Sequence, residues 1–346
     1  MATEQKMQSA TMRKVAVTGG GGFIGRALVQ ALVGRGVEVR VIGRTPYPDL
    51  AAQGVRCIRG DIRERSTFED ALRGCDTVFH TAAKAGIWGP RQEYFAINHI
   101  GTVHVIAACR AQGVPRLVYT STPSVVFDRD NLDGVDESAP YAKRPLCAYA
   151  AAKILAEQAV LAANESELRT IALRPHLVWG PGDHHLIPRL LERGRAGQLK
   201  IVGTGDNRVD IAFIDNVVHA HLLAAENLGT TGSGAGQAFF IGQEEPVALW
   251  QWINGLFVRL DIPPVTRRVP LAVAYGAGMM LEGIHGALKI TSEPRMTRFL
   301  ACQLAKSHWF SHRKAEQLLG YRPLVTTDEG IERLVNWLRK GDDRPA

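Results

Sequence analysis

Short runs of apolar and β-branched residues alternate with longer amphipathic stretches through the first half of the chain. A short run of this kind predicts a strand, whereas apolar residues spaced three and four apart predict a helix. Helices are expected between most of the strands, for example at 25–36 and 99–113. The strands are expected at 15–17, 37–43, 55–61, 76–82, 116–122 and 168–175. This alternation predicts an α/β fold, a Rossmann-type doubly wound parallel sheet with helices on both faces.

The pattern changes after residue 178, where proline and glycine become more frequent and the helical stretches lengthen. The segments at 179–190 and 202–210 have the composition of loops over a site, so we expect a smaller, mixed α/β substrate-binding lobe. The expected organisation is a flexible tail (1–12), a dinucleotide-binding Rossmann domain (13–178), the substrate-binding lobe (179–340) and a second tail (341–346). A segment at 209–228 is expected to return to the Rossmann domain.

The segment VPLAVAYGAGMMLEGIHGALKI, at 269–290, is apolar enough to be tested as a membrane segment. Its uncharged part ends at Leu281, well short of the roughly 20 residues that a spanning helix needs. Glu282, His285 and Lys289 then interrupt it. The sequence therefore predicts no membrane span and favours a buried or cavity-lining helix. An interfacial helix, with peripheral membrane contact, is the alternative.

Composition and charge exclude several classes of function. The net charge of +7 comes from scattered lysines and arginines, without a zinc-finger spacing or a basic helix, so no nucleic-acid partner is expected. The five cysteines are far apart and the N-terminus lacks the apolar core of a signal peptide, which predicts a reducing, cytoplasmic location. The pairs His184-His185 and His219-x-His221 lack further ligands at suitable spacing, so no metal site is expected.

A run of four glycines, in TGGGGFIG at 18–25, follows the first expected strand and opens the first expected helix. The spacing Gly19-x-x-Gly22-x-x-Gly25 lets the backbone turn tightly and approach a pyrophosphate at the helix N-terminus. The strand–loop–helix setting favours this interpretation over a plain flexible turn. The sequence therefore predicts a dinucleotide site here.

The end of the second expected strand bears on the choice of dinucleotide. An acidic residue there would hold the ribose 2′-hydroxyl of NAD(H), but this chain has Gly43-Arg44. The guanidinium of Arg44 is suited to a 2′-phosphate. NADP(H) is therefore favoured, with NAD(H) as the alternative if Arg44 is a surface residue that merely follows a strand.

A tyrosine and a lysine four residues apart, Tyr149 and Lys153, lie on one face of an expected amphipathic helix. A free phenol has a pKa of about 10, too high for efficient acid–base chemistry near neutral pH. A nearby ammonium group and an oxidised nicotinamide would lower that value. Tyr149 would then give a proton to a carbonyl oxygen as hydride arrives at the carbon, while Lys153 holds the nicotinamide ribose.

Further motifs accompany these two, up to HWFSHRKAEQLLGYRPLVTTDEGI at 308–331, and the resemblance that they carry covers roughly residues 13 to 337. They also include HTAAKAGIWG (80–89), YTSTPSV (119–125), LRPHLVWGPGDHHLIPRL (173–190) and FIDNVVHAH (213–221). The set resembles the extended short-chain dehydrogenase/reductase superfamily, and most strongly its 3β-hydroxysteroid dehydrogenase branch. Within that branch, AKAGIWG, TSTPSV and WGPGDHHLIPRL are most similar to bacterial reductases of 2-alkyl-3-oxoalkanoates in long-chain olefin synthesis.

The resemblance implies roles for individual residues. Thr122 matches the catalytic hydroxyl that binds the substrate oxygen, beside Tyr149 and Lys153, and Asn98 matches the asparagine that supports the lysine. Substrate contacts are implied for Ser124, His176 and Trp179, although a tryptophan here also suits a core position. Cofactor contacts are implied for Gly19, Gly22, Phe23, Ile24, Gly25, Arg44, Asp61, Ile62, Ala82, Ala83, Ser121, Tyr149 and Lys153.

The resemblance also implies an activity, namely hydride transfer between NADP(H) and the ketone or secondary alcohol of a hydrophobic small molecule. The expected reaction is reduction of a 2-alkyl-3-oxoalkanoate to the 3-hydroxy acid. A 3β-hydroxysteroid dehydrogenase is one alternative. A nucleotide-sugar epimerase or dehydratase is another, in which Arg208 would hold a diphosphate. A homodimer is implied, and contacts with other enzymes of the same pathway are left open.

Overall fold

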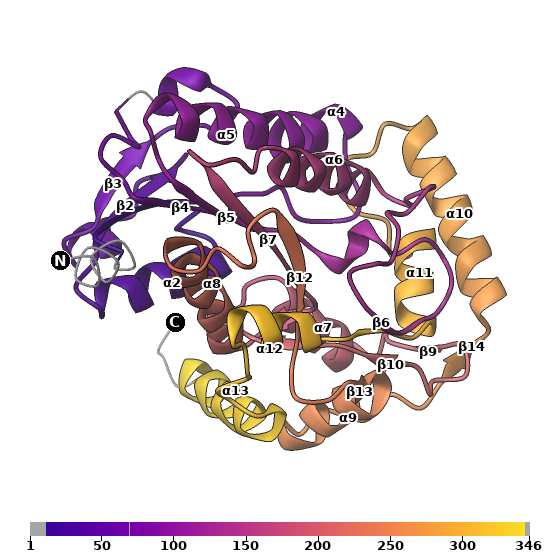
Figure 1. Ribbon diagram of the computed structural model, residues 1–346. Coiled ribbons are helices and arrows are strands. Elements are labelled where there is room, and N and C mark those ends of the chain that lie inside the picture. The colour runs from indigo at the N-terminus through magenta and orange to yellow at the C-terminus, as the bar shows by residue number, and fades with distance from the viewer. Residues whose placement is uncertain (1–11, 69, 343–346) are drawn as a thin grey trace.

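A seven-stranded parallel sheet forms the centre of the molecule (Figure 1), in a computed structural model that describes residues 12–68 and 70–342. The strand order is β12-β7-β5-β4-β1-β2-β3, and every neighbouring pair is parallel. The strands are β1 (Lys14–Thr18), β2 (Glu38–Gly43), β3 (Arg56–Arg59), β4 (Thr77–His80), β5 (Arg116–Thr120), β7 (Arg169–Pro175) and β12 (Gln237–Ile241). The predicted Rossmann-type fold is confirmed, and β12 is a strand that the sequence did not predict.

Helices cover both faces of this sheet because its strands are apolar on both sides. In β1, Val15 and Val17 belong to one core cluster and Ala16 to another. Helices α5 (Gly101–Ala111) and α6 (Ala148–Ala162) lie on one face, as Figure 1 shows. The opposite face is covered by α2 (Phe23–Val33), α8 (Ile214–Gly229) and α12 (Arg313–Leu319). Burial on both faces is what a parallel sheet requires.

The chain reverses its direction across the sheet at β1. It runs outward from β1 through β2 to β3, and then crosses to β4, β5 and β7 on the other side of β1. Ligands of doubly wound sheets bind beyond the carboxyl ends of the strands at such a reversal. The fold therefore places a binding crevice between the ends of β1 and β4.

A smaller lobe completes the molecule and contains a mixed sheet of order β13-β10-β15-β6. In it β15 is parallel to β10 and β6, whereas β13 is antiparallel to β10. The strands outside the main sheet are β6 (Leu132–Val135), β8 (Val178–Trp179), β9 (Ile201–Val202), β10 (Arg208–Val209), β11 (Ala212–Phe213), β13 (Val247–Ala248), β14 (Arg268–Val269) and β15 (His308–Phe310). The remaining helices are α3 (Pro48–Ala51), α4 (Arg91–Tyr94), α7 (Leu186–Arg195), α9 (Leu249–Arg259), α10 (Leu271–Ala287), α11 (Arg298–Ala305) and α13 (Thr327–Asp342).

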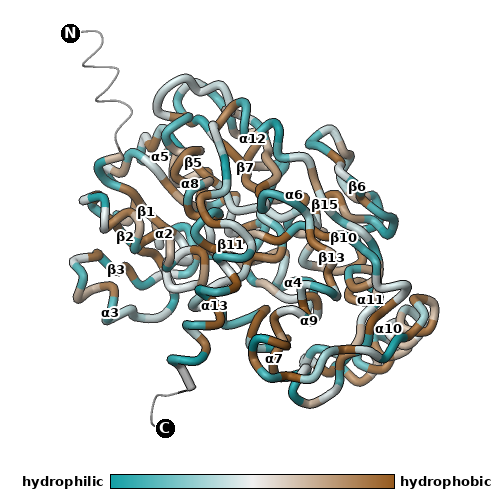
Figure 2. Tube along the Cα trace, turned by 90° about the horizontal axis from the view of Figure 1, so that it is seen from below, coloured by the Kyte–Doolittle hydropathy of each residue, from teal (hydrophilic) through white to brown (hydrophobic). Residues whose placement is uncertain are grey.

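Helix α10 corresponds to the apolar segment at 269–290, and the favoured prediction of a buried helix is wrong. Of its residues only Ala274 and Gly278 are buried, and much of the helix surface faces outward. Figure 2 shows α10 at the edge of the molecule, with hydrophobic positions along it. No helix in the described ranges has both the length and the apolarity that crossing a bilayer requires.

Candidate active site

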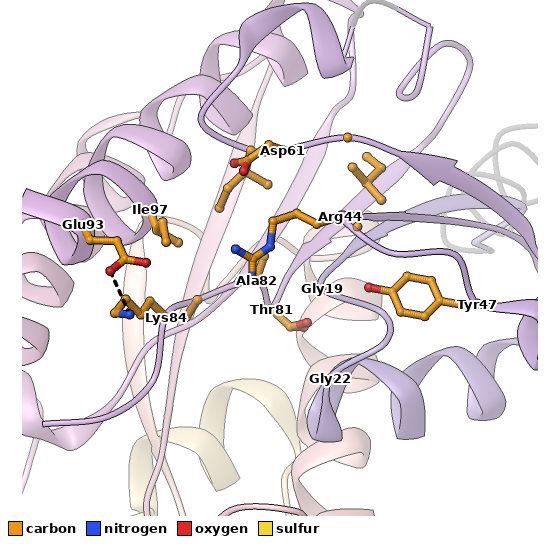
Figure 3. A pocket seen from close by; sticks show the side chains of 15 residues that line it. Gly19, Gly22, Arg44, Tyr47, Asp61, Thr81, Ala82, Lys84, Glu93 and Ile97 are labelled. Carbon is orange, nitrogen blue, oxygen red and sulfur yellow. Dashed lines mark ion pairs between the residues drawn. The ribbon is translucent and has the colours of Figure 1, made fainter. Parts of the chain in front are cut away.

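A cavity of about 270 Å³ lies at the carboxyl ends of four strands, where the sheet reverses (Figure 3). Each strand contributes the residues that directly follow it, so the cavity is built from four loops and one helix. Its lining comprises Gly19, Gly22, Ile42, Gly43, Arg44, Tyr47, Gly60, Asp61, Ile62, Thr81, Ala82, Ala83, Lys84, Glu93 and Ile97. Seven of these residues were assigned to the cofactor from the sequence: Gly19, Gly22, Arg44, Asp61, Ile62, Ala82 and Ala83.

The glycine loop is shaped by close backbone contacts. Gly19 has a φ of 73°, and a Cβ atom on it would lie 2.7 Å from the Cα of Ala82. The N–H of Gly22 donates to the carbonyl of Gly19 at 2.9 Å, and a side chain on Gly25 would clash with the same carbonyl. The loop therefore lies flat against the end of β4 and leads directly into α2. This bare backbone at a helix N-terminus fits the pyrophosphate of a dinucleotide.

Phe23 and Ile24 form the first turn of α2, but their side chains point away from this cavity. Phe23 lines a second cavity and makes an edge contact with His184, with 6.4 Å between ring centroids. Ile24 packs against the core of the smaller lobe. Only their backbone N–H groups are placed to meet a phosphate.

Basic and aromatic groups surround the part of the cavity that follows β2. The exposed Arg44 extends into it on the side of Asp61, as Figure 3 shows. Tyr47 covers Gly43, and any side chain at position 43 would collide with the Tyr47 hydroxyl. Asp61 forms an ion pair with Arg63 at 2.6 Å, which together with Arg44 lowers the pKa of Asp61. The cavity wall next to β2 is thus positively charged.

The loop after β4 is fixed by Asn98, which lies in a π-helical turn, Phe95–Ile100. The Asn98 Oδ1 accepts from the Lys84 N–H at 2.7 Å, and its Nδ2 donates to the Lys84 carbonyl at 3.0 Å. Asn98 makes no hydrogen bond to Lys153 in the described chain. The support of the lysine stays a prediction, and the observed role of Asn98 is to clamp the loop that carries Ala82 and Ala83.

Tyr149, Lys153 and Thr122 come together at the carboxyl end of β5. Lys153, only 2% exposed, donates from Nζ to the Thr120 carbonyl at 2.6 Å and lies 4.2 Å from the centroid of the Tyr119 ring. One turn earlier on α6, the half-buried Tyr149 lies near enough to the Thr122 hydroxyl for Thr122 to lower the pKa of the phenol. The structure thus brings the three predicted catalytic residues into one site.

Thr122 is held in place by the turn that follows it. Its Oγ1 accepts from the Ser124 N–H at 3.2 Å and lies 3.2 Å from the Ser124 hydroxyl. Thr122 and Ser124 are both buried beside the Tyr149 position. Ser124 therefore orients Thr122, and its own contact with a substrate stays a prediction.

Burial dominates the electrostatics of the tyrosine–lysine pair. It raises the pKa of Tyr149 to about 12, against the lowering effect of the nearby Thr122 hydroxyl. It lowers the pKa of Lys153 to about 7, and Glu157 acts in the opposite direction. The lowered Tyr149 pKa expected from the sequence is not found in the protein alone, because the Lys153 ammonium faces Thr120 and Tyr119 instead.

Glu157 and Arg174 form a buried ion pair behind the site, which the sequence analysis missed. Glu157 is fully buried one turn after Lys153 and accepts from Arg174 at 2.5 and 3.0 Å. Its carboxylate also accepts from the Ser121 hydroxyl and from the Tyr141 hydroxyl. The Ser121 side chain is therefore directed at Glu157, and its contact with a cofactor stays a prediction. The four-residue spacing from Lys153 to Glu157 was the only signal available in the sequence.

Two predicted substrate residues lie in packed surroundings. His176 follows β7, is buried, and its Nε2 lies 2.7 Å from Nδ1 of His308. Burial lowers the pKa of both histidines. Trp179 is fully buried and packs edge-on against Phe213 and Trp252. The prediction that Trp179 contacts substrate is wrong, because β8 turns this side chain into the core of the smaller lobe.

Comparisons with known proteins agree with this geometry. Residues 16–271 match the model of the 3-beta hydroxysteroid dehydrogenase/isomerase family. A protein named 2-alkyl-3-oxoalkanoate reductase from Shewanella oneidensis is 46% identical over 344 residues, covering 96% of this chain and 89% of the relative. The Mus musculus protein named sterol-4-alpha-carboxylate 3-dehydrogenase, decarboxylating, is 36% identical, covering 93% of this chain and 90% of the relative.

The solved structures that resemble the fold include a dinucleotide complex. The structure of MoeE5 with UDP-glucose and NAD superposes with a TM-score of 0.74 at 27% identity, covering 95% of this chain and all of that chain. The match extends through both the parallel sheet and the smaller lobe. With the family match and the relatives above, these findings show that the chain belongs to the 3-beta hydroxysteroid dehydrogenase/isomerase family and is an oxidoreductase acting on CH–OH groups.

Proposed function

We propose that the chain is an NADP(H)-dependent reductase that converts a hydrophobic 2-alkyl-3-oxo acid into the 3-hydroxy acid. The observation that carries the proposal is that Tyr149 and Thr122 lie close together at the end of β5, with Lys153 one turn further along α6 and bonded to the Thr120 carbonyl. This group lies at the end of β5, and the dinucleotide cavity lies at the ends of β1 to β4, of which β4 is the direct neighbour of β5 in the sheet. Such an arrangement suits proton transfer to a ketone oxygen.

The names of the two relatives support one class of substrate, because both describe the same functional group. In a 2-alkyl-3-oxoalkanoate the ketone carbon is β to the carboxylate, and the carbon between them carries an alkyl group. In a sterol 4-carboxylate oxidised at position 3, the ketone has the same relation to the carboxylate. Acids of this kind lose carbon dioxide as ketones but are stable as alcohols. Reduction would therefore preserve the carboxylate that the decarboxylating relative removes.

The side chains of this chain supply the proton part of the reaction. A bound nicotinamide dinucleotide would supply the hydride. Because burial holds the pKa of Tyr149 near 12, its hydroxyl carries a proton at neutral pH, the form that ketone reduction needs. Thr122 holds the ketone oxygen beside that hydroxyl. The Lys153 side chain, held by the Thr120 carbonyl, would in its ammonium form balance the charge left on the phenolate.

The cavity wall next to β2 supports NADP(H) as the cofactor. Arg44 is exposed at the cavity edge and makes no ion pair within the described ranges. Tyr47 occupies the space that an acidic side chain at position 43 would need. A 2′-phosphate would meet a guanidinium there, and no carboxylate follows β2 to hold a 2′-hydroxyl.

Replacement of the proton donor tests the proposal. In Tyr149→Phe, kcat for reduction of a long-chain 2-alkyl-3-oxo acid should fall by about 10²- to 10⁴-fold, because the proton source is removed. NADPH affinity, measured by fluorescence titration, should remain within about twofold, since the phenyl ring still packs in place. Tyr321→Phe is a matched control, because this buried hydroxyl donates to the Gly242 carbonyl at 2.7 Å, away from the site. Retained turnover in Tyr149→Phe would refute the assignment.

The steroid alternative is tested by offering a 3-ketosteroid as the substrate in the same NADPH oxidation assay.

The nucleotide-sugar alternative lacks support from Arg208. This exposed side chain stacks over the ring of Trp309, 5.5 Å from its centroid, and does not line the dinucleotide cavity. Net oxidation of NADPH during turnover would rule out an epimerase, which regenerates its cofactor in each cycle.

A further inference from the structure

Helix α10 has its polar side chains toward the protein and its apolar side chains outward. On the inner side, Glu282 accepts from the Arg298 side chain at 2.7 Å, and His285 makes an edge contact with Trp88. A surface helix normally has the opposite arrangement, with an apolar stripe facing the core. The outward residues are Val273 (58% exposed), Met279 (58%), Met280 (60%) and Ile284 (44%), followed by Leu288 (67%) just after the helix.

The outward residues form a continuous surface along the helix. At about 100° per residue, positions 273, 280, 284 and 288 fall on one line along its axis. Positions 272, 276, 279, 283 and 287 lie beside that line, and they hold only alanine, glycine and methionine. About half of the helix circumference therefore has no charged or hydrogen-bonding side chain. Exposed apolar surfaces of this kind mark sites of interaction.

Positive charges lie at both ends of this surface. Arg267 and Arg268 come just before the helix and Lys289 just after it, and all three are exposed. None of the three makes an ion pair within the described ranges. Glu282 is the single acidic residue between positions 262 and 292, and it is already paired with Arg298. The rim of the apolar surface is therefore basic.

We propose that the α10 face (Val273, Met279, Met280, Ile284 and Leu288, with Arg267, Arg268 and Lys289 at its ends) docks onto an anionic lipid bilayer. The helix would lie in the plane of the interface, with its apolar side chains below the head groups and its basic residues among the phosphates. Charge complementarity favours lipid over a second copy of this chain, because a paired α10 face would bring basic ends against basic ends. Figure 1 shows α10 at the edge of the molecule. The described elements therefore leave its outer side free to approach a bilayer.

The docked surface would lie one helix away from the reaction site. Tyr275, on the inner side of α10, packs in the same cluster as Tyr149 and Phe299. A hydrophobic molecule dissolved in the bilayer would thus have a short path to the site. The docking proposal itself rests on the surface alone and is independent of the proposed reaction.

Vesicle binding tests the proposal without any assay of activity. The full-length protein is sedimented with vesicles of phosphatidylcholine containing phosphatidylglycerol, and with phosphatidylcholine alone. We expect binding to the anionic vesicles that weakens as salt concentration rises. The double variant Met280→Glu/Ile284→Glu should bind about tenfold or more weakly, because two buried apolar side chains are replaced by anions. Arg267→Gln/Arg268→Gln/Lys289→Gln should lose the preference for anionic lipid.

A control at another exposed apolar residue shows whether vesicle binding depends on the α10 face or on any exposed apolar side chain. Val258→Glu, at a residue of α9 that is 63% exposed, should bind vesicles like the parent protein. Circular dichroism and light scattering establish that each variant is folded and report its oligomeric state. The proposal is overturned if the parent protein does not bind anionic vesicles, or if Val258→Glu weakens binding as much as the α10 variant. It is equally overturned if the α10 variant changes the oligomeric state while vesicle binding is unaffected.

Discussion

Tyr149 and Lys153 are one helical turn apart, and burial shifts their pKa values in opposite directions. The phenol rises to a pKa of about 12 and the amine falls to about 7. Desolvation disfavours the charged form of each group, which is the phenolate of one and the ammonium of the other. At neutral pH the proton to be transferred therefore resides on Tyr149. In a reductase this is the productive ground state, since the tyrosine has to give up a proton and not to take one.

Arg44 is the residue through which the cofactor preference can be tested. In Arg44→Ala we expect NADPH to bind about 10- to 100-fold more weakly, because a charge-assisted hydrogen bond to a phosphate is lost. NADH, which has a hydroxyl at that position, should change by about twofold at most. Fluorescence titration with each dinucleotide gives the two dissociation constants.

A matched control is available on the neighbouring strand. Arg56→Ala removes another exposed arginine, which lies at the start of β3 and therefore at the amino ends of the strands, away from the cavity at their carboxyl ends. It should leave both dissociation constants unchanged. Equal weakening of NADPH and NADH in Arg44→Ala would contradict the assignment of a 2′-phosphate site.

Site residues that belong to one short sequence motif could be predicted. Site residues whose partners come from distant parts of the chain could not. The glycine spacing and the Tyr149–Lys153 pair are visible in short stretches of sequence, and both lie where they were expected. Glu157 was missed because a glutamate on a helix is normally exposed to solvent. Only the fold brings Arg174 from β7 and Ser121 from the end of β5 to its carboxylate. Trp179 was misplaced for the same reason, because local sequence does not reveal which side of β8 is buried.

At the scale of elements, a π-helical turn positions the loop after β4. The π-helical turn Phe95–Ile100 interrupts the helix between α4 and α5 and contains Asn98. π-Helical turns are often found at functional sites, because the extra residue redirects a side chain. Here that side chain clamps the backbone of Lys84 and so fixes the wall of the dinucleotide cavity.

The Asn98 clamp leads to a prediction that separates positioning from stability. Asn98→Ala should weaken dinucleotide binding by about tenfold and lower the free energy of unfolding by about 1–3 kcal/mol, because two backbone groups lose their partners. Asn254→Ala is the control, since Asn254, on α9, makes the same two hydrogen bonds to the backbone of Val265. It should cost similar stability in a denaturant titration. An equal loss of dinucleotide affinity in both variants would show that the effect of Asn98 is only structural.

The elements themselves were largely predictable where their signals were local. Six strands lie close to their expected positions because each is a short apolar run between polar or glycine residues. The seventh, β12, contains the apolar run Ala238–Ile241, but its partner β7 is more than sixty residues away. Pairing over such a separation cannot be inferred from periodicity. Helix α10 was misassigned because apolar composition indicates burial only when a partner for the surface is known.

At the scale of the whole molecule, buried histidines connect layers that are distant in sequence. His80, on β4, hydrogen-bonds to Thr18 of β1 and to Thr102 of α5. His221, on α8, bonds through Nε2 to Thr120 of β5 at 2.7 Å. Both imidazoles are completely buried and neutral, because burial lowers the pKa of His80 to about 3 and that of His221 to about 4. The two faces of the sheet are thus each joined to their helices by a neutral histidine.

This neutrality predicts how stability depends on pH. In the unfolded chain each histidine takes up a proton near pH 6.5, whereas in the folded protein it does so only near pH 3 to 4. Their contribution is therefore complete above pH 6.5 and is lost as the pH falls, by about 2 kcal/mol per histidine at pH 5. Urea titrations between pH 7.5 and 5 measure the free energy of unfolding. His80→Gln should lessen the loss of stability between pH 7.5 and 5 by about 2 kcal/mol, while His184→Gln, at an exposed histidine, should leave that loss unchanged. An unchanged loss of stability in His80→Gln would mean that acid acts elsewhere, and that the β1–β4–α5 contact does not depend on a neutral imidazole.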